Sequence, residues 1–436
     1  QYFRVNDPYR LLGLLVILLI FYLPSFVFPP DLTYPELRSI VTGEKVNDGN
    51  ILYLELVDSV APLAAWFGAL IDIVFGRSLL ARHILAFFII FLQSSYIGMV
   101  FANKRAFAEN SYIPSLVSAI LFMFSFDTIC LTPELLGAGF LLPALNNLFK
   151  EIEFREQRDE SIFNLGLYIS LASLCSFSYS VFLVGVIITL IIFTRSSARK
   201  YFLMIFGFVL PHLLLLSTFY LMDGLPQLLD YFYIPNLQIG SNPYISTGSV
   251  WILGALPLTF LFISIVMMNR DARFSKYQSQ LVQCMFFWMV FSVLQILYSK
   301  DFRPQTLITL IPSMSFFFTH FFLLIRRKRI AETYLWILLL GTITISYSSR
   351  YNFLPGVSYN ELFVPDQKQI PNGSNRVLVL DDDWSIYKGN SLATPFFNWK
   401  LSGEIFSHPH YYENVIQVYD GLLSDPPDII RDKNDL

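Results

Sequence analysis

The chain is poor in the residues on which many soluble enzymes and disulfide-stabilised domains depend. Of its 436 residues only 14% are charged, and three are cysteines. Cys130, Cys175 and Cys284 lie in or at the ends of apolar stretches, without metal-ligand or disulfide spacing. We therefore interpret them as small core residues, which argues against a disulfide framework and a cysteine metal site.

Several catalytic and binding motifs are also missing. The sequence has no glycine-rich phosphate loop, no GxSxG turn and no HExxH motif. No basic and aromatic surface is visible, so we expect no nucleic-acid partner. The five histidines are scattered, and His408 and His410 in the tail have no acidic or cysteine partner at ligand spacing. We expect neither a metal site nor a cofactor.

Apolar residues, in contrast, are abundant. They make up 54% of the chain, with 43 Phe and 24 Tyr. No water-soluble fold needs that much apolar surface, so the sequence predicts an all-α polytopic membrane protein. The run 11–28 is too long for a cleavable signal and lacks a small-residue cleavage site, so we expect it to stay as a transmembrane helix.

Apolar runs of roughly 17–25 residues are long enough to span a membrane, and we expect about 11 of them. They lie near residues 11–28, 80–102, 112–129, 131–149, 162–178, 179–195, 200–221, 250–268, 280–298, 304–325 and 333–348. Segment 60–76 is shorter and interrupted. We interpret it as a juxtamembrane or re-entrant helix.

Basic residues are grouped in alternate loops of this arrangement. The groups are Lys104 with Arg105, Lys150 to Arg158, Arg195 to Lys200, Arg270 to Lys276, and Arg326 to Arg329. All five fall on one side, which is cytoplasmic by the positive-inside rule, together with the N-terminus. The loops 29–79, 222–249 and 299–303 then lie outside with the tail. A full span at 60–76 would break this pattern.

The tail changes composition after Arg350, where the sequence becomes polar. Residues 376–381 have the pattern of a buried strand, 410–423 have helical periodicity, and 428–431 could form a second strand. A packed unit of about 80 residues is marginal by itself, so we expect it to lean on the outer loops. The expected domains are 1–349 in the membrane and a small α/β domain at 350–436 outside it.

The outer loop after the first helix is rich in acids. Between Phe28 and Trp66 the acids are Asp31, Glu36, Glu44, Asp48, Glu55 and Asp58. A polar loop of this length is uncommon unless it is functional. If 32–43 is a helix, Asp31 could be its N-cap. Alternatively, Asp31 and Glu36 are carboxylates at the membrane surface that accept a proton.

Other outer charges allow two interpretations each. Glu134 could be a favourable first-turn charge of its helix, or could line the same outer cavity as Asp31. Lys300 and Arg303 could be snorkelling helix ends, or a clamp for a lipid phosphate. Arg82 is a further outer cation at the start of a span.

Three segments together resemble the GT-C fold integral-membrane glycosyltransferases. LTYPELRSIVTGE (32–44) is similar to that family's first-loop helix, and FRPQTLITLIPSMSF (302–316) to its late Arg-Pro-Tyr helix. VAPLAAWFGALIDIVFGRSLLARHI (60–84) is similar to a Pro-Leu-x-x-Trp, Phe-Gly and Ala-Arg signature, which matches Pro62, Leu63, Trp66, Phe75, Gly76, Ala81 and Arg82. The resemblance is nearest to the branch that uses dolichyl- or undecaprenyl-phosphate sugars, which includes protein mannosyltransferases and the lipid A aminoarabinose transferase.

The sequence departs from that family at three places. The family's adjacent acidic pair corresponds to Pro30 and Asp31, so the first acid is missing. Its lysine before the Pro-Leu motif falls near Val60, and the tyrosine of the late helix is Gln305 or Thr306. These departures concern catalysis more than the fold.

The resemblance implies transfer of a sugar, with inversion, from a polyprenyl-phosphate donor to an extracytoplasmic acceptor, without nucleotide or obligatory metal. The phosphate would be held by Arg303, Lys300 or Arg82, Asp31 with Glu36 would be the general base, and Glu134 and Asp58 would belong to the substrate site. The protein would lie in a bacterial inner membrane, with its N-terminus cytoplasmic and its C-terminus periplasmic.

A non-catalytic function is the competing interpretation. A GT-C-like scaffold without the full acidic pair could be a subunit of a cell-envelope or secretion complex, which would dock protein partners through the C-terminal domain. A transporter is disfavoured, because the two halves show no matching Gly- or Pro-broken helices.

Overall fold

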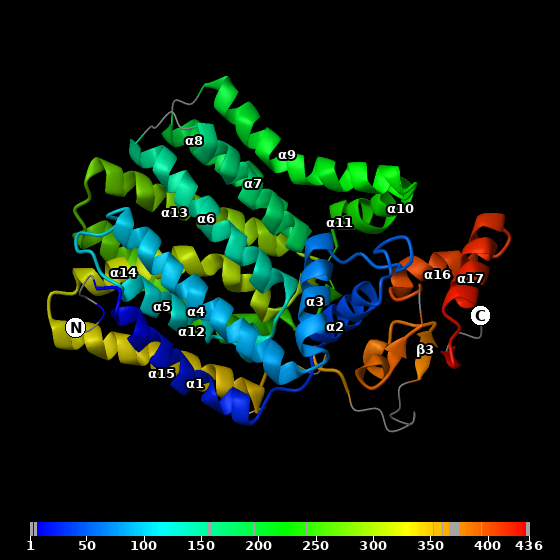
Figure 1. The fold of residues 1–436 in the computed structure, drawn as a ribbon. Coiled ribbons are helices and arrows are strands. Elements are labelled where there is room, and N and C mark those ends of the chain that lie inside the picture. Colours follow the sequence, from blue (N-terminus) through cyan, green and yellow to red (C-terminus); the bar gives the residue numbers. More distant parts are fainter. Residues whose placement is uncertain are drawn as a thin grey trace.

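The structure is a computed structural model that describes residues 3, 7–154, 159–194, 197–240, 242–351, 353–359, 361–365, 375–393 and 395–432. Most of these residues are helical, and a small parallel sheet lies near the C-terminus. The expected fold class, a helical membrane bundle with a small α/β part, is confirmed. Figure 1 shows the bundle with this α/β part beyond one of its ends.

Helices of 10 to 25 residues form the bundle. They are α1 (Arg10–Val27), α4 (Leu79–Asn103), α5 (Ile113–Phe122), α6 (Pro133–Phe154), α7 (Asp159–Cys175), α8 (Val181–Phe193), α9 (Ala198–Leu221), α12 (Thr247–Asp271), α13 (Lys276–Tyr298), α14 (Ile311–Leu324) and α15 (Lys328–Arg350). Each apolar run expected from the sequence overlaps one of them. Among the described residues, seven helical segments are long and apolar enough to cross a membrane. A multi-pass membrane protein follows, while the number of about 11 crossings stays a prediction.

The bundle core is made of large apolar side chains. Phe101, Phe149 and Phe316 are fully buried, and the ring of Phe101 contacts Phe149 tilted and Phe316 edge-on. Small residues let the helices approach closely: a Cβ on Gly166 of α7 would come within 2.0 Å of the backbone of α9. Small residues at such crossings are typical of helix packing in lipid.

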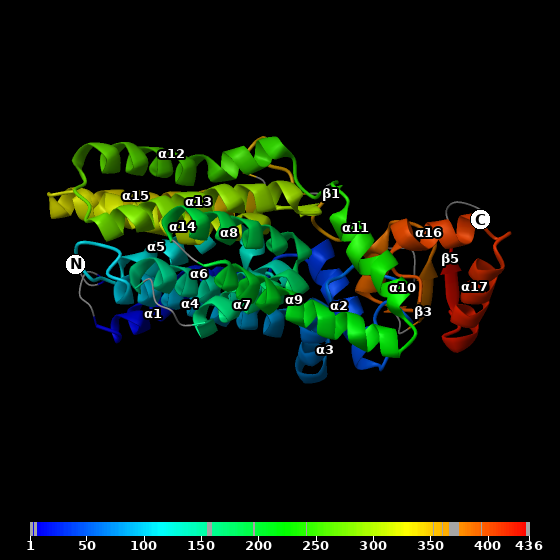
Figure 2. The ribbon, with the colours of Figure 1, turned by 90° about the horizontal axis from the view of Figure 1, so that it is seen from above.

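The two ends of the bundle differ in what they carry. Figures 1 and 2 show the N-terminus and the turns from α4 to α5, from α12 to α13 and from α14 to α15 at one end. The helices α2 and α3 and the C-terminal elements lie at the opposite end. The structure thus separates the turns expected to be cytoplasmic from the loops expected outside. Which end faces the cytoplasm stays a prediction from the basic loops.

Two helices of 14 residues each follow α1 in the acid-rich loop. They are α2 (Tyr34–Asn47) and α3 (Pro62–Phe75). The N-cap of α2 is Thr33, whose side chain forms a capping box with Glu36. The possible N-cap role of Asp31 is therefore wrong, because the helix starts two residues later, with Pro35 in its first turn. With 14 residues, α3 is shorter than the roughly 20 that span a bilayer.

The C-terminal part is a three-stranded parallel sheet with helices. Its order is β4–β3–β5, and its elements are β3 (Arg376–Val379), η6 (Trp384–Lys388), β4 (Ser391–Leu392), α16 (Trp399–Ser407), α17 (Tyr412–Ser424) and β5 (Ile429–Arg431). The expected strands at 376–381 and 428–431 and the helix at 410–423 are confirmed. Val377 and Leu392 share one buried cluster with Leu37 and Ile40 of α2, so this unit leans on the outer loop as expected.

Short elements complete the outer end. They are η2 (Phe126–Ile129), η3 (Phe177–Ser180), α10 (Leu225–Leu228), the π-helical turn η4 (Leu229–Tyr233), α11 (Ile234–Leu237), β1 (Asn242–Pro243), β2 (Asp301–Phe302) and η5 (Pro304–Leu310). Strands β1 and β2 pair in parallel, with Asn242 opposite Asp301. This pairing joins the loop after α11 to the loop after α13.

Candidate functional site

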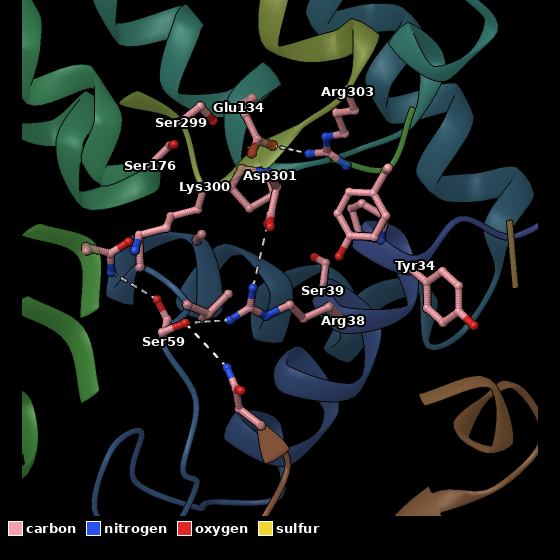
Figure 3. A pocket seen from close by; sticks show the side chains of 18 of the residues that line it. Tyr34, Arg38, Ser39, Ser59, Glu134, Ser176, Ser299, Lys300, Asp301 and Arg303 are labelled. Carbon is pink, nitrogen blue, oxygen red and sulfur yellow. Dashed lines mark hydrogen bonds and ion pairs between the residues drawn. The ribbon is translucent and has the colours of Figure 1, made fainter. Parts of the chain in front are cut away.

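A cavity of about 740 Å³ lies where the outer end of the bundle meets α2 and the C-terminal unit. Its wall includes side chains from α2, the start of α6, the loop 298–303 and the tail. The volume falls in the range of small-molecule sites. Figure 3 shows the charged side chains that point into it.

Arg38 of α2 forms the floor of the charged region. Its guanidinium is held by Asp58 through two hydrogen bonds, one of them from Nε to Oδ2 at 3.2 Å. Asp58 is fully buried and also accepts a hydrogen bond of 3.2 Å from the side chain of Asn398. A buried carboxylate needs such partners, because an unpaired charge in the interior costs several kcal/mol. Asp58 thus fixes Arg38 and ties the tail to the first loop.

Arg303 and Glu134 form a second ion pair in the wall. The Arg303 guanidinium bonds the Glu134 carboxylate, with only 3% and 9% of the two side chains exposed. Glu134 is in the first turn of α6, and Arg303 directly precedes η5. The loop around Arg303 is held by the Asp127 carboxylate, which accepts from the backbone N–H of Gln305 at 2.9 Å. The direction of Arg303 is therefore set by buried groups.

Lys300 and Asp301 are neighbours in the chain that point different ways into the cavity (Figure 3). Asp301 lies 3.7 Å from Nη1 of Arg38. Among the described residues, Lys300 has no ion pair or hydrogen bond. Burial lowers the pKa of Lys300, which means that its environment penalises the positive charge. An anion entering the cavity would relieve that penalty.

Aromatic rings occupy another part of the wall. Tyr34 stacks on Tyr244 with the ring centroids 6.5 Å apart, and Arg38 lies over the ring of Trp384. All of these side chains line the cavity. Flat aromatic faces beside polar groups can bind the apolar face of a sugar while side chains bond its hydroxyls.

Three of the residues predicted from the sequence meet at this cavity. Arg303, Lys300 and Glu134 all line it. Asp58 does not line it but holds Arg38, which does. Arg82 lies elsewhere, buried at the start of α4, where it donates a hydrogen bond of 3.2 Å to the carbonyl of Gly76.

The two predicted catalytic acids are not brought to the cavity. Asp31 is exposed and does not line it. Glu36 is buried, and its carboxylate bonds Thr33 Oγ1 at 2.9 Å and His83 Nε2 at 2.8 Å. Burial raises the pKa of Glu36, but its bonds to His83 and Thr33 outweigh this and leave it below the usual value. Glu36 therefore stabilises the start of α2 and does not line the cavity, while its catalytic role stays a prediction.

Two side chains at the site were not predicted. Arg38 lies inside the segment 32–44 that carried the family resemblance, and Asp301 lies between Lys300 and Arg303, the two cations that drew attention to that loop. The charge of the 300–303 loop could have pointed to Asp301. Nothing local singles out Arg38, because Asp301, its partner across the cavity, is far away in the sequence.

One group among the described residues has the chemistry of metal ligands. The ligand atoms of Glu36, His83 and Cys130 lie within 4.8 Å of one another, and all three residues are buried. The hydrogen bond between Glu36 and His83 and the capping role of Glu36 account for two of them. The group does not line the cavity, so it supplies no ligand to a reaction there.

No protein-family model matches the sequence, and no curated protein matches it. Among solved structures, ArnT (aminoarabinose transferase) from Cupriavidus metallidurans, bound to undecaprenyl phosphate, is similar over 94% of this chain and 90% of that chain, with a TM-score of 0.59 and 12% identity. The chain has the GT-C fold.

The apo structure of the same ArnT is similar over 78% of this chain and 65% of that chain, with a TM-score of 0.52 and 14% identity. At such identities the likeness extends to the GT-C fold and not to individual residues. Each of the segments 32–44, 60–84 and 302–316 contributes side chains to the cavity wall. In this GT-C chain the segments that carry the family resemblance therefore surround one site.

Proposed function

We propose that the cavity binds the phosphate and sugar of a polyprenyl-phosphate sugar and transfers the sugar to an acceptor outside the cytoplasm. The observation that carries this proposal is the convergence of Arg38, Lys300 and Arg303 with carboxylates in one cavity of a GT-C bundle. The similar ArnT structure holds undecaprenyl phosphate, which supports a lipid phosphate as the ligand.

The phosphate is assigned to Lys300 and Arg303. Lys300 has an ammonium group that no described residue pairs, while Arg303 is kept in place by Glu134. In a partly dry site, such fixed cations stabilise charge far better than they do in water. As the bond between the sugar and the phosphate breaks, negative charge grows on the phosphate oxygen that leaves, and these cations favour that change.

The proposed transfer is a single displacement. An acceptor hydroxyl attacks the anomeric carbon, the carbon–oxygen bond to phosphate breaks, and its electron pair leaves with the lipid phosphate. The configuration at the anomeric carbon inverts, and the hydroxyl proton passes to a base. The site needs no nucleotide. By the basic loops, the cavity faces the periplasm and the N-terminus lies in the cytoplasm of a bacterium.

The experiment is native mass spectrometry of the full chain purified from its own membranes. We expect a bound polyprenyl phosphate or polyprenyl-phosphate sugar on the wild type, and a reduced amount on Lys300→Ala and Arg303→Ala. The matched control is Arg199→Ala, which removes an exposed arginine that is paired with Asp159 and does not line the cavity. A wild type without either lipid would contradict the proposal.

One observation favours a second function. The acid at the family's motif position, Asp31, is exposed and lies outside the cavity wall. A GT-C scaffold that docks envelope proteins through its tail would need no base there. For such a scaffold, cellular function would survive the loss of the cavity cations but not deletion of the tail from Arg376.

A further inference from the structure

We propose that Asp301 is the general base that takes the proton of the acceptor hydroxyl. This assignment rests on the transfer reaction proposed above. It differs from the family resemblance, which implies that Asp31 and Glu36 carry this role.

The backbone places Asp301 inside the cavity. It begins β2, whose parallel pairing with β1 sets Asp301 opposite Asn242. Its side chain is 25% exposed, which leaves it open to a substrate while the rest of the loop is held. The loop ends at Arg303, which is fixed by Glu134.

The carboxylate of Asp301 is free to accept a proton. Its one ion pair, with Nη1 of Arg38, is loose at 3.7 Å. No hydrogen bond to this carboxylate occurs among the described residues. An acceptor hydroxyl can therefore donate to Asp301 without displacing an existing bond, which a general base within hydrogen-bond reach must allow.

The other carboxylates around the site are engaged or solvated. Glu134 is bonded to Arg303 and almost fully buried. Asp58 is fully buried and accepts hydrogen bonds from Arg38 and Asn398. Glu361 and Asp382 line the rim but are exposed. Among these carboxylates, only Asp301 is partly buried and also has oxygens that accept no hydrogen bond from a described residue.

Its surroundings also suit a base. Burial raises the pKa of Asp301, Arg38 and Arg303 lower it, and Glu134 and Asp58 raise it again, with a net rise above the usual value. Lys300 adds a positive charge next in the chain. Asp301 therefore binds a proton more readily than a solvated aspartate does, which strengthens a base that must remain ionised at working pH.

Residues of the cavity accept both the proton and the negative charge that the transfer step releases. As the hydroxyl oxygen forms its bond to the anomeric carbon, its proton moves to a carboxylate oxygen of Asp301. The bond from that carbon to the phosphate oxygen breaks, and its electron pair stays on the phosphate beside Lys300 and Arg303. Because Lys300 and Asp301 diverge from adjacent positions, one short loop presents the cation and the base to different parts of the cavity (Figure 3).

The test compares the lipid that co-purifies with the wild type and with Asp301→Asn. Asparagine keeps the size of the side chain, and Arg38 keeps its main partner Asp58. Losing a general base slows transfer by about 100-fold or more. We therefore expect native mass spectrometry to find sugar-free polyprenyl phosphate on the wild type and the intact polyprenyl-phosphate sugar on Asp301→Asn. The matched control is Asp48→Asn, which changes an exposed aspartate of the first outer loop, away from the cavity, and should resemble the wild type.

A pH profile provides the second readout. In membrane vesicles, the wild-type rate of sugar loss from the bound donor should fall as pH drops and Asp301 becomes protonated. Because the pKa of Asp301 is raised, this fall should begin above the range of an ordinary aspartate. Asp301→Glu should keep the acid limb, whereas Asp301→Asn should have a low rate without that limb. A merely structural aspartate would not move the profile in this way.

The outcomes separate the two proposals. If no polyprenyl lipid binds any variant, the transfer function itself fails. If the wild type binds the lipid and Asp301→Asn shows the same ratio of sugar-bearing to sugar-free lipid, Asp301 is not the base while the proposed function stands. If Asp301→Asn does not fold, the pH profiles of the wild type and of Asp301→Glu decide. Profiles of both proteins without an acid limb would equally overturn the assignment.

Discussion

Arg303 shows how a single buried cation can be kept ready for a ligand. With 3% of its side chain exposed, it needs a counter-charge, and Glu134 provides one from the first turn of α6. The pair is attached to two different segments, so breaking it would leave a buried charge without a partner. The guanidinium is thereby oriented before any phosphate arrives.

The first prediction concerns that orientation. A lysine cannot reproduce the planar fork of arginine, so Arg303→Lys should weaken the binding of undecaprenyl phosphate by about 10-fold, or roughly 1.4 kcal/mol. The measurement is equilibrium binding to the purified full chain. Arg199→Lys, which alters an exposed ion pair with Asp159 away from the cavity, is the control and should bind like the wild type. If the wild type and both variants bind undecaprenyl phosphate with equal affinity, Arg303 does not contact the phosphate.

The second prediction sets the two aspartates against each other. The motif position predicts that Asp31→Asn lowers transfer by about 100-fold, whereas the cavity predicts a loss of that size for Asp301→Asn. Because Asp31 is exposed and does not cap α2, we expect its variant to transfer faster than the Asp301 variant. The two strains are scored for the amount of glycan product. A larger loss in Asp31→Asn would return the base to the first loop.

The sequence predicts charged residues better than it predicts their partners. Lys300, Arg303 and Glu134 were found because charges are rare in this chain and these lie at outer helix ends. Arg38 was not found from the sequence, because its partners Asp58 and Asp301 come from other segments that only the fold brings together. Asp31 was assigned from its position at the family motif and Glu36 as a nearby carboxylate of the same loop, yet helix capping decided where Glu36 lies.

At the scale of elements, α2 and α3 cross so closely that their backbones nearly touch. A Cβ on Gly43 would lie 2.5 Å from the backbone carbon of Gly68. Backbone atoms cannot yield as a flexible side chain can, so the two helices would have to separate. Since α2 carries Arg38, the crossing also sets one wall of the cavity.

The third prediction follows from this contact. Gly43→Ala should destabilise the outer segment by about 1–3 kcal/mol, the usual cost of overpacking, and should lower the midpoint of thermal unfolding. The control is Gly254→Ala in α12, where the new methyl would meet only a Leu258 side chain at 3.6 Å. An unchanged midpoint for Gly43→Ala would show that α2 and α3 can separate freely.

Long elements were predictable and short ones were not. The apolar runs predicted the helices of the bundle, because a long apolar run leaves little other choice in a membrane. Two runs are only partly α-helical, since 112–129 ends its α-helix at Phe122 and 304–325 begins with the 3-10 turn η5. The two-residue strands β1, β2 and β4 carry no periodicity of their own. They form where tertiary packing aligns the backbones, and one of these pairs positions Asp301.

At the scale of the whole molecule, the chain separates a lipid-facing bundle from a polar outer end. Lys45 of α2 bonds Asp425 of the tail at 3.1 Å, and Arg77 bonds the carbonyl of Tyr387 at 3.0 Å. These contacts hold the C-terminal unit, which supplies part of the cavity wall, against the first loop. The composition predicted both parts, but the cavity between them depends on contacts across hundreds of residues.

The fourth prediction is the orientation of that architecture. A reporter that is active only in the cytoplasm should be silent when it is fused after Leu436, and active when it is fused after Lys328. The reason is that five basic loops lie on the side of the N-terminus. Activity at Leu436 would reverse or break the topology.

The claim that the outer cavity is a lipid-phosphate site is tested most directly by a cryo-electron microscopy structure of the full chain with undecaprenyl phosphate. We predict that the phosphate lies in the cavity within hydrogen-bonding distance, about 3 Å, of Lys300 and Arg303. We also predict that the lipid chain leaves between helices of the bundle. A phosphate bound outside the cavity, or an empty cavity at saturating lipid, would contradict the assignment.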